Sequence, residues 1–133
     1  MSVATTIDLE ARLKDLHQYI REGRIIEAMH EFYAKDVVMQ ENANPPAVGL
    51  DTNIEREKQF LSAVKEWKGF EVKSIGMGGD VTFYEAVFDW IAIDGTTVHL
   101  EQVAVARWRG GKIAHERFYY DPAALAKPEC CAT

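Results

Sequence analysis

Residues 80–94, DVTFYEAVFDWIAID, and residues 96–110, TTVHLEQVAVARWRG, alternate in a way that decides the fold. Aromatic, apolar and small side chains dominate the even positions, whereas the odd positions mix charged with β-branched side chains. A period of two is typical of a strand with one buried face. The Asp-Gly pair between the segments favours a hairpin. We therefore expect two long antiparallel strands joined by a tight turn.

The same period continues in the segments on either side. FEVKSIGM (70–77) precedes the hairpin and KIAHERFYY (112–120) follows it, and a glycine pair compatible with a tight turn separates each from its neighbour. The four segments predict an antiparallel meander. Its even face is the more apolar one, so we expect helices to cover that face.

The N-terminal half predicts three helices. Apolar side chains recur at spacings of three and four in residues 7–22 and again in residues 24–33. A third helix is expected to begin at Thr52, which forms a capping box with Glu55, and to end at Gly69. The predicted fold class is α+β, with three N-terminal helices packed on the concave face of a curved antiparallel sheet.

Length and charge limit the classes of function. At 133 residues the chain is expected to form a single domain, residues 1–122, followed by a C-terminal tail, residues 123–133. A formal charge of −6 argues against nucleic-acid binding. The adjacent Cys130 and Cys131 lack the spacing of zinc ligands, so we expect no metal. With neither a signal sequence nor a long apolar run, a cytoplasmic protein is expected that does not bind a membrane.

The even face is expected to leave an internal pocket. Small side chains alternate there with large rings, which leaves room beneath the helices for a small molecule. The candidate pocket residues come from all these segments: Tyr19, Trp67, Tyr84, Phe88, Trp90, Gln102, Trp108, Phe118 and Tyr120.

Two glutamates are the candidate catalytic residues. Glu116 is the lone carboxylate on the even face of the last three strands, so its pKa should rise unless it has a partner. It is either a proton donor or a buried acid bonded to Gln102, Tyr120 or a helix-end amide. Glu41 shares the parity of Val37 and Met39, and it is either a general base or a loop acid near solvent.

The odd face offers a different candidate site. His99 and Glu101 form an H-x-E pair there, within what resembles a ladder of cross-strand charge pairs. A β-bulge between residues 98 and 103 would instead turn Glu101 inward. Among the charges lie valines such as Val103 and Val105, so we expect a homodimer through the sheet.

Two stretches and the order of elements resemble a known group of proteins. FYAKDVVMQENANPPAVGLD (32–51) and ARWRGGKIAHERFYYDP (106–122) are similar to segments of the nuclear-transport-factor-2-like superfamily, and within it of the small SnoaL-like and ketosteroid-isomerase-like proteins. The resemblance covers residues 8–122 and implies a cystatin-like cone with an apolar pocket. Members include isomerases, cyclases, dehydratases, epoxide hydrolases and non-catalytic binding domains, so the fold does not give the function.

The resemblance also implies roles for single residues. The general-base position of the isomerases falls on Glu41, whereas the two oxyanion-hole positions fall on Leu16 and Ala104, which donate no hydrogen bond. Tyr19 lies one helical turn from Leu16 and could replace the missing donor. SnoaL-like cyclases use an acid on the last strand, for which Glu116 or Asp121 is the nearest candidate. Authentic steroid isomerase activity is therefore not expected.

The residues and the resemblance together lead to one expectation and two alternatives. We expect cofactor-independent acid-base catalysis on a small apolar or carbonyl-bearing molecule, of the isomerase, cyclase or dehydratase type. Glu41 would act as the base, and Glu116, with Gln102 or Tyr19, would stabilise the developing charge. The first alternative is a ligand-binding or accessory domain without turnover, and the second is an assembly module whose exposed sheet recruits a partner.

Overall fold

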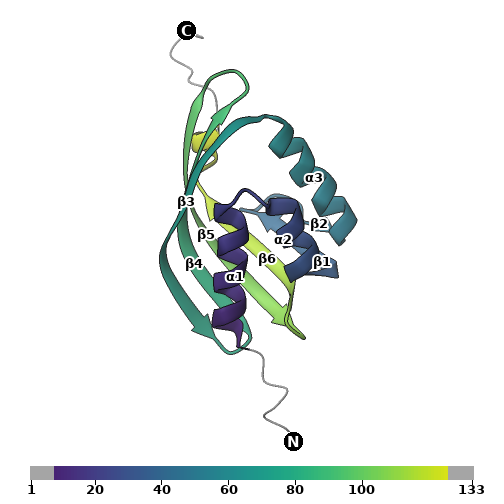
Figure 1. The fold of residues 1–133 in the computed structure, drawn as a ribbon. Coiled ribbons are helices and arrows are strands. Elements are labelled where there is room, and N and C mark those ends of the chain that lie inside the picture. Colours follow the sequence, from purple (N-terminus) through teal and green to yellow (C-terminus); the bar gives the residue numbers. More distant parts are fainter. Residues whose placement is uncertain (1–7, 126–133) are drawn as a thin grey trace, which may run out of the picture.

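Three helices pack against one face of a strongly curved sheet in the computed structural model, which describes residues 8–125 (Figure 1). In chain order the elements are α1 (Leu9–Arg21), α2 (Ile25–Phe32), β1 (Tyr33–Glu41), β2 (Ala47–Val48), α3 (Leu50–Ser62), β3 (Val64–Gly78), β4 (Val81–Ala92), β5 (Thr97–Arg109), β6 (Lys112–Tyr120) and the short 3₁₀ helix η2 (Pro122–Leu125). The expected first two helices are confirmed to within two residues at each end.

The sheet has six strands in the order β2-β1-β6-β5-β4-β3. Strands β3 to β6 form the predicted antiparallel meander. The expectation of a wholly antiparallel sheet is wrong, because β1 pairs with β6 in parallel and with β2 in antiparallel orientation. This pairing joins segments about 80 residues apart, and alternation within a single segment does not specify a distant partner. It places Met39 beside Glu116 and Glu41 beside Phe118.

The third helix differs most from its prediction. It ends at Ser62, and β3 begins at Val64, so Val64 and Trp67 belong to a strand. Its N-cap is Gly49, and no side chain caps the helix. Irregularities in the β3–β4 pairing on both sides of Trp67 interrupt the period of two, which is why its apolar positions could be mistaken for a helical stripe.

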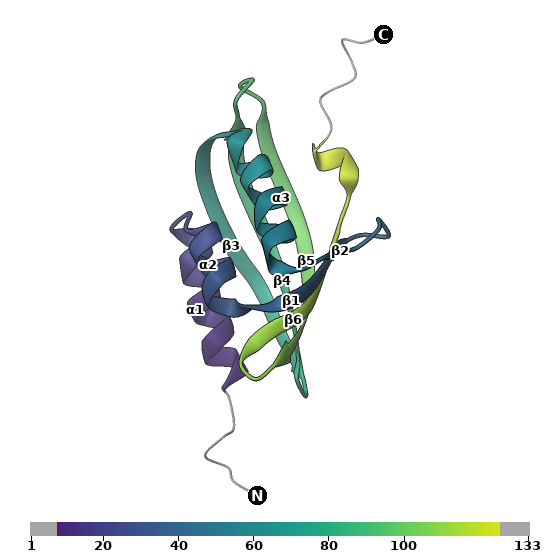
Figure 2. The ribbon, with the colours of Figure 1, turned by 90° about the vertical axis from the view of Figure 1, so that its right-hand side faces the viewer.

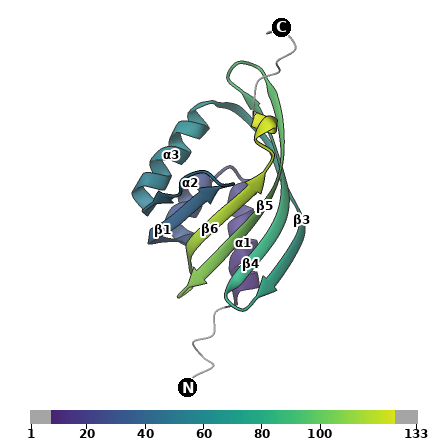
Figure 3. The ribbon, with the colours of Figure 1, turned by 180° about the vertical axis from the view of Figure 1, so that it is seen from behind.

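The predicted inner face of the sheet is confirmed. Tyr84, Trp90 and Leu100 are buried, and Ala104 and Ala106 have no exposed surface. A register shift at Arg107 and Trp108 then makes Ile113 the buried residue, rather than Ala114. Turned to the side, the structure shows α1 and α2 at one end of the concave face and α3 along the other (Figure 2). From behind, none of the three helices α1, α2 and α3 covers the outer face of the sheet (Figure 3).

The apolar core divides into two clusters. The larger packs α1 and α2 on the sheet around Leu13, Phe32 and Tyr84, and the smaller surrounds Trp90 and Leu100. Among residues 8–125, no helix has both the length and the hydrophobicity needed to span a bilayer. The expected tail begins as η2, while residues 126–133, with both cysteines, lie outside the described part of the chain.

Candidate functional site

A cavity of about 540 Å³ lies between the two core clusters, under α3. Its walls include eight aromatic rings, which come from α3 and from four strands of the sheet: Tyr33, Phe60, Trp67, Tyr84, Phe88, Trp90, Phe118 and Tyr120. Trp67 and Trp90 stack with nearly parallel rings, and Trp67 Nε1 donates a 3.1 Å hydrogen bond to the carbonyl of Ile20. These contacts hold one wall in place.

Most of the predicted pocket residues lie at this cavity, but two do not. Trp67, Tyr84, Phe88, Trp90, Gln102, Phe118 and Tyr120 line it. Tyr19 instead packs edge-on against Phe32, under the guanidinium of Arg24, because it lies off the stripe by which α1 faces the sheet. Trp108 is buried elsewhere in the core and donates a 2.9 Å hydrogen bond to Thr82. Tyr19 therefore does not line this cavity.

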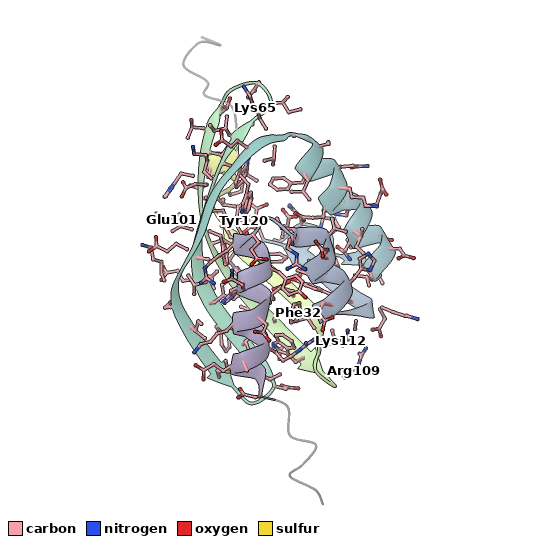
Figure 4. All side chains as sticks on the ribbon, in the orientation of Figure 1. Phe32, Lys65, Glu101, Arg109, Lys112 and Tyr120 are labelled. Carbon is pink, nitrogen blue, oxygen red and sulfur yellow. The ribbon has the colours of Figure 1, made fainter. Side chains whose placement is uncertain are left out.

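Glu41 reaches the cavity from the end of β1. The hydroxyl of Tyr120 donates a hydrogen bond to its Oε1. Burial, followed by this bond and the charge of Glu41, raises the pKa of Tyr120. The hydroxyl therefore keeps its proton at neutral pH and acts as a donor. Figure 4 shows Tyr120 in the space between the sheet and α3.

The chain just after Glu41 is anchored to β6. Asn42 has a φ of 52°, a conformation that asparagine tolerates better than most residues. Its Oδ1 accepts a 3.0 Å hydrogen bond from the Tyr120 amide, and its carbonyl accepts one from Arg117 Nε. Its own amide bonds to the carbonyl of Phe118. The carboxylate and its tyrosine partner are thus held by one rigid junction.

Glu116 is fully buried in the core and lies behind the cavity wall. The hydroxyl of Tyr33 donates a hydrogen bond to its Oε1, whereas Oε2 has no partner. Burial raises the pKa of Glu116 to about 7; the bond from Tyr33 opposes this rise, and the charge of Glu57 adds to it. The expected partners Gln102, Tyr120 and a helix-end amide are not the ones observed. Because Tyr33 lines the cavity, Glu116 reaches it through that hydroxyl.

Glu57 is a cavity residue that the sequence analysis missed. It extends from α3, is half-buried, and lines the same cavity as Glu41. Burial, together with the charge of Glu41, raises the pKa of Glu57 to about 7. Its position three residues after the buried Ile54 puts it on the same face of the helix, which is the signal that could have identified it.

His17 brings a further polar side chain to the core next to the cavity. Its ring meets that of Tyr84 edge-on, with centroids 4.4 Å apart, and its Nε2 has no hydrogen-bond partner. Burial, assisted by the charge of Arg21, lowers the pKa of His17 to about 4. The imidazole is therefore neutral at physiological pH.

His99 and Glu101, the alternative site, lie on the outer face of the sheet, and Glu101 does not point into the cavity. The β4–β5 pairing runs without a register shift from Val81 to Ile91, so the bulge that would redirect Glu101 is absent. His99 lies 2.7 Å from Asp89 and 3.5 Å from Glu101, and Glu101 projects from the outer side of the sheet (Figure 4). Among the described residues no cluster of His, Cys, Asp and Glu is suited to a metal ion.

The sequence matches one family model over most of its length. The model describes the SnoaL-like polyketide cyclases and matches residues 11–128. The chain belongs to this family. Among curated proteins, none is similar enough in sequence to count as a match to this SnoaL-like chain.

Solved structures share the fold at low sequence identity. A protein from Mesorhizobium loti described as a SnoaL-like polyketide cyclase is 23% identical, with a TM-score of 0.71, over 86% of this chain and all (100%) of its own. An NTF2-like protein of unknown function from Burkholderia pseudomallei is 14% identical, with a TM-score of 0.78, over 90% of this chain and 95% of its own. TerC, co-crystallised with polyporic acid, is 16% identical, with a TM-score of 0.73, over 86% of this chain and 92% of its own. The SnoaL-like, NTF2-like resemblance expected from the sequence is confirmed.

The cavity of this SnoaL-like protein brings together groups that accept and donate protons. Glu41 and Glu57 supply carboxyl groups from two elements, and the hydroxyls of Tyr33 and Tyr120 are bonded to acids. Around them the walls are apolar, so electrostatic interactions inside are stronger than in water. Such an arrangement suits proton transfer on a small, mostly apolar molecule.

Proposed function

We propose that this protein binds a small, largely apolar carbonyl compound in its cavity and catalyses proton transfer on it without a cofactor. The observation that carries the proposal is the Glu41 carboxylate, which lies on an aromatic cavity wall and accepts a hydrogen bond from Tyr120. The SnoaL-like polyketide cyclase family and the structure of TerC, co-crystallised with polyporic acid, support a small-molecule ligand.

Glu41 acts as the general base. Its carboxylate removes a proton from a carbon next to the carbonyl group, and the electron pair of the C–H bond moves onto the carbonyl oxygen as an enolate. The rigid junction of Asn42 with β6 limits the freedom of this carboxylate, which favours a reproducible approach to the substrate.

Glu116 assists through Tyr33. When Glu116 is protonated, its O–H donates to the oxygen of Tyr33, and the proton of Tyr33 becomes available to the enolate oxygen. A neutral acid therefore converts a cavity tyrosine into a directed hydrogen-bond donor, without itself touching the substrate. The amide of Gln102, also at the cavity, supplies a second donor.

The substitution Glu41→Gln separates catalysis from simple binding. The probe is β-tetralone, a bicyclic aromatic ketone, incubated with protein in deuterium oxide; NMR follows the exchange of its acidic C–H protons. We expect Glu41→Gln to slow the protein-catalysed exchange by about 100-fold, the usual size of a general-base contribution. Quenching of the fluorescence of Trp67 and Trp90 by the probe should persist, because the cavity is unchanged.

The matched control is Glu101→Gln, which removes a carboxylate from the outer face. If the wild type and Glu41→Gln bind the probe equally well and neither catalyses exchange, catalysis is contradicted. That result favours the alternative of a ligand-binding domain. Exchange that survives Glu41→Gln undiminished would remove Glu41 from the mechanism.

The chain is further proposed to work in the cytoplasm, as a single domain of residues 1–122, and as a homodimer through the outer face of the sheet. Phe83, Val103 and Tyr119 are exposed large hydrophobic residues on that side of the strands. Light scattering tests the assembly. A monomer in the wild type, or a dimer unaffected by Val103→Lys, contradicts this interface.

A further inference from the structure

We propose that Glu57 is the general acid of this site, which gives a proton to the substrate while Glu41 removes one. The substrate would then be a compound with two reacting positions, an acidic C–H beside a carbonyl and an oxygen that gains a proton on the α3 side of the cavity. This inference rests on the proposed function and extends it to a residue and a substrate class.

The backbone holds Glu57 at the cavity. The side-chain amide of Asn53 donates to the carbonyls of Gly49 and Ala47, at 2.8 and 3.0 Å, and thereby ties the start of α3 to β2. Ile54 is buried in the larger core cluster. Glu57 follows one turn after both and lines the cavity as part of the same wall. Its location is therefore set by packing.

The carboxyl group of Glu57 has no internal partner. Within residues 8–125 it makes no hydrogen bond and no ion pair, although it is half-buried. Arg56, its neighbour on the helix, also lines the cavity but forms no ion pair with it. A half-buried carboxylate without a partner is costly when ionised, so the neutral acid is favoured.

Glu41 and Glu57 have opposite surroundings. Glu41 accepts a hydrogen bond from Tyr120, an arrangement suited to an ionised carboxylate. Glu57 faces the charge of Glu41 and lies near Glu116 and Tyr33, neither of which carries positive charge. Two carboxyl groups whose surroundings differ in this way divide into a base and an acid.

The proton balance is complete without a co-reactant. The carboxylate of Glu41 takes the proton of the C–H bond, whose electrons move toward the carbonyl oxygen. The O–H bond of Glu57 breaks as its proton passes to this carbonyl oxygen, which gains negative charge. Glu41 is then protonated and Glu57 ionised. Both side chains are only partly buried, so Glu41 gives its proton to water and Glu57 takes one from water, which restores both groups.

The protonation state is tested by a carboxyl-carbon NMR titration of the full chain, labelled at glutamate, with Glu57→Gln for assignment. We expect Glu57 to titrate with a pKa near 7 and this pKa to fall in Glu41→Gln, because the facing charge is gone. The matched control, Glu55→Gln, removes an exposed carboxylate from the same helix and should leave the titration unchanged. A pKa of Glu57 within the ordinary range of glutamate overturns the inference.

Catalysis is tested by the pH profile of β-tetralone exchange. In the wild type the protein-catalysed rate should decline as pH rises through about 7, where Glu57 loses its proton. In Glu57→Gln the decline should become shallower, because only Glu116 then loses a proton in this range, and the maximal rate should fall about tenfold or more. A rate and profile equal to the wild type overturn the role of Glu57 and leave Glu41 as the base. Absence of exchange in the wild type overturns the proposed function, and this inference with it.

Discussion

The hydroxyl of Tyr33 donates a hydrogen bond to Glu116, a carboxyl group that no solvent reaches and whose second oxygen has no partner. One hydrogen bond does not replace the hydration of a carboxylate, and the pKa of Glu116 rises to about 7 for this reason. The pair therefore links the proton on a core residue to a hydroxyl on the cavity wall.

Glu116 should make the protein less stable as pH rises. Between pH 4.5 and about 7 the folded state keeps a proton on this carboxyl that the unfolded state has lost, so the free energy of unfolding falls with increasing pH. A pKa shift of this size corresponds to a decrease of about 3 kcal/mol in the free energy of unfolding. Urea unfolding of the wild type and Glu116→Gln at pH 5 and pH 8 measures it.

In Glu116→Gln about half of the total loss should disappear, and the remainder reflects Glu57, whose pKa is raised to the same value and acts in the same direction. Glu101→Gln serves as the control on the outer face. An equal loss of stability in the wild type and in Glu116→Gln would show that Glu116 is paired or hydrated in the folded protein.

His17 should weaken the protein in acid. Its pKa falls from 6.5 to about 4 on burial, so between these pH values the imidazole is protonated in the unfolded state and neutral in the folded state. The free energy of unfolding therefore decreases as pH falls from 6.5 to 4. His17→Phe, which keeps a ring against Tyr84, should be less sensitive to acid. His30→Phe, at an exposed position of α2, is the control. Unchanged acid sensitivity in His17→Phe refutes the prediction.

Asn53→Ala should destabilise the junction of β2 and α3. The change removes both hydrogen bonds from the Asn53 amide and leaves the carbonyl of Ala47 without this donor. We expect a loss of about 2 kcal/mol in the free energy of unfolding. Thermal or urea unfolding measures this loss, with the exposed Thr52→Ala as the control in the same turn. Equal stability of the two variants would mean that the Asn53 bonds do not hold the helix.

Tyr120→Phe tests the partner of Glu41. The substitution removes the hydroxyl that donates to the carboxylate but keeps a ring in the cavity wall. We expect the rate of β-tetralone exchange to fall about tenfold, because the base loses its fixed orientation. Tyr119→Phe, on the exposed side of β6, should not change the rate. Equal rates for both variants would show that the hydrogen bond has no functional role.

The alternation in β4 and β5 was enough to predict which side chains face the helices. It holds because the pairing of these two strands has no irregularity between Val81 and Ile91. In β3 the register shifts, and the apolar spacing of Val64 and Trp67 fitted a helix as well as a strand. The parallel pairing of β1 with β6 joins distant segments, which local patterns do not predict.

The candidate site was predictable only in part. Glu41 and most of the cavity rings follow from parity, and so does the burial of Glu116. Its partner Tyr33 does not, because the sequence placed that residue at the end of a helix, where it had no face on the sheet. Glu57 could have been identified from its position three residues after Ile54, although the sequence placed both the cap and the end of this helix wrongly.

Deuterium incorporation into β-tetralone by the wild type and Glu41→Gln, measured side by side at one neutral pH, tests the central claim most directly. The account predicts protein-catalysed exchange in the wild type that falls about 100-fold in the variant, while binding of the probe is retained. Equal exchange by both proteins, or none by either despite binding, would contradict acid-base catalysis by Glu41.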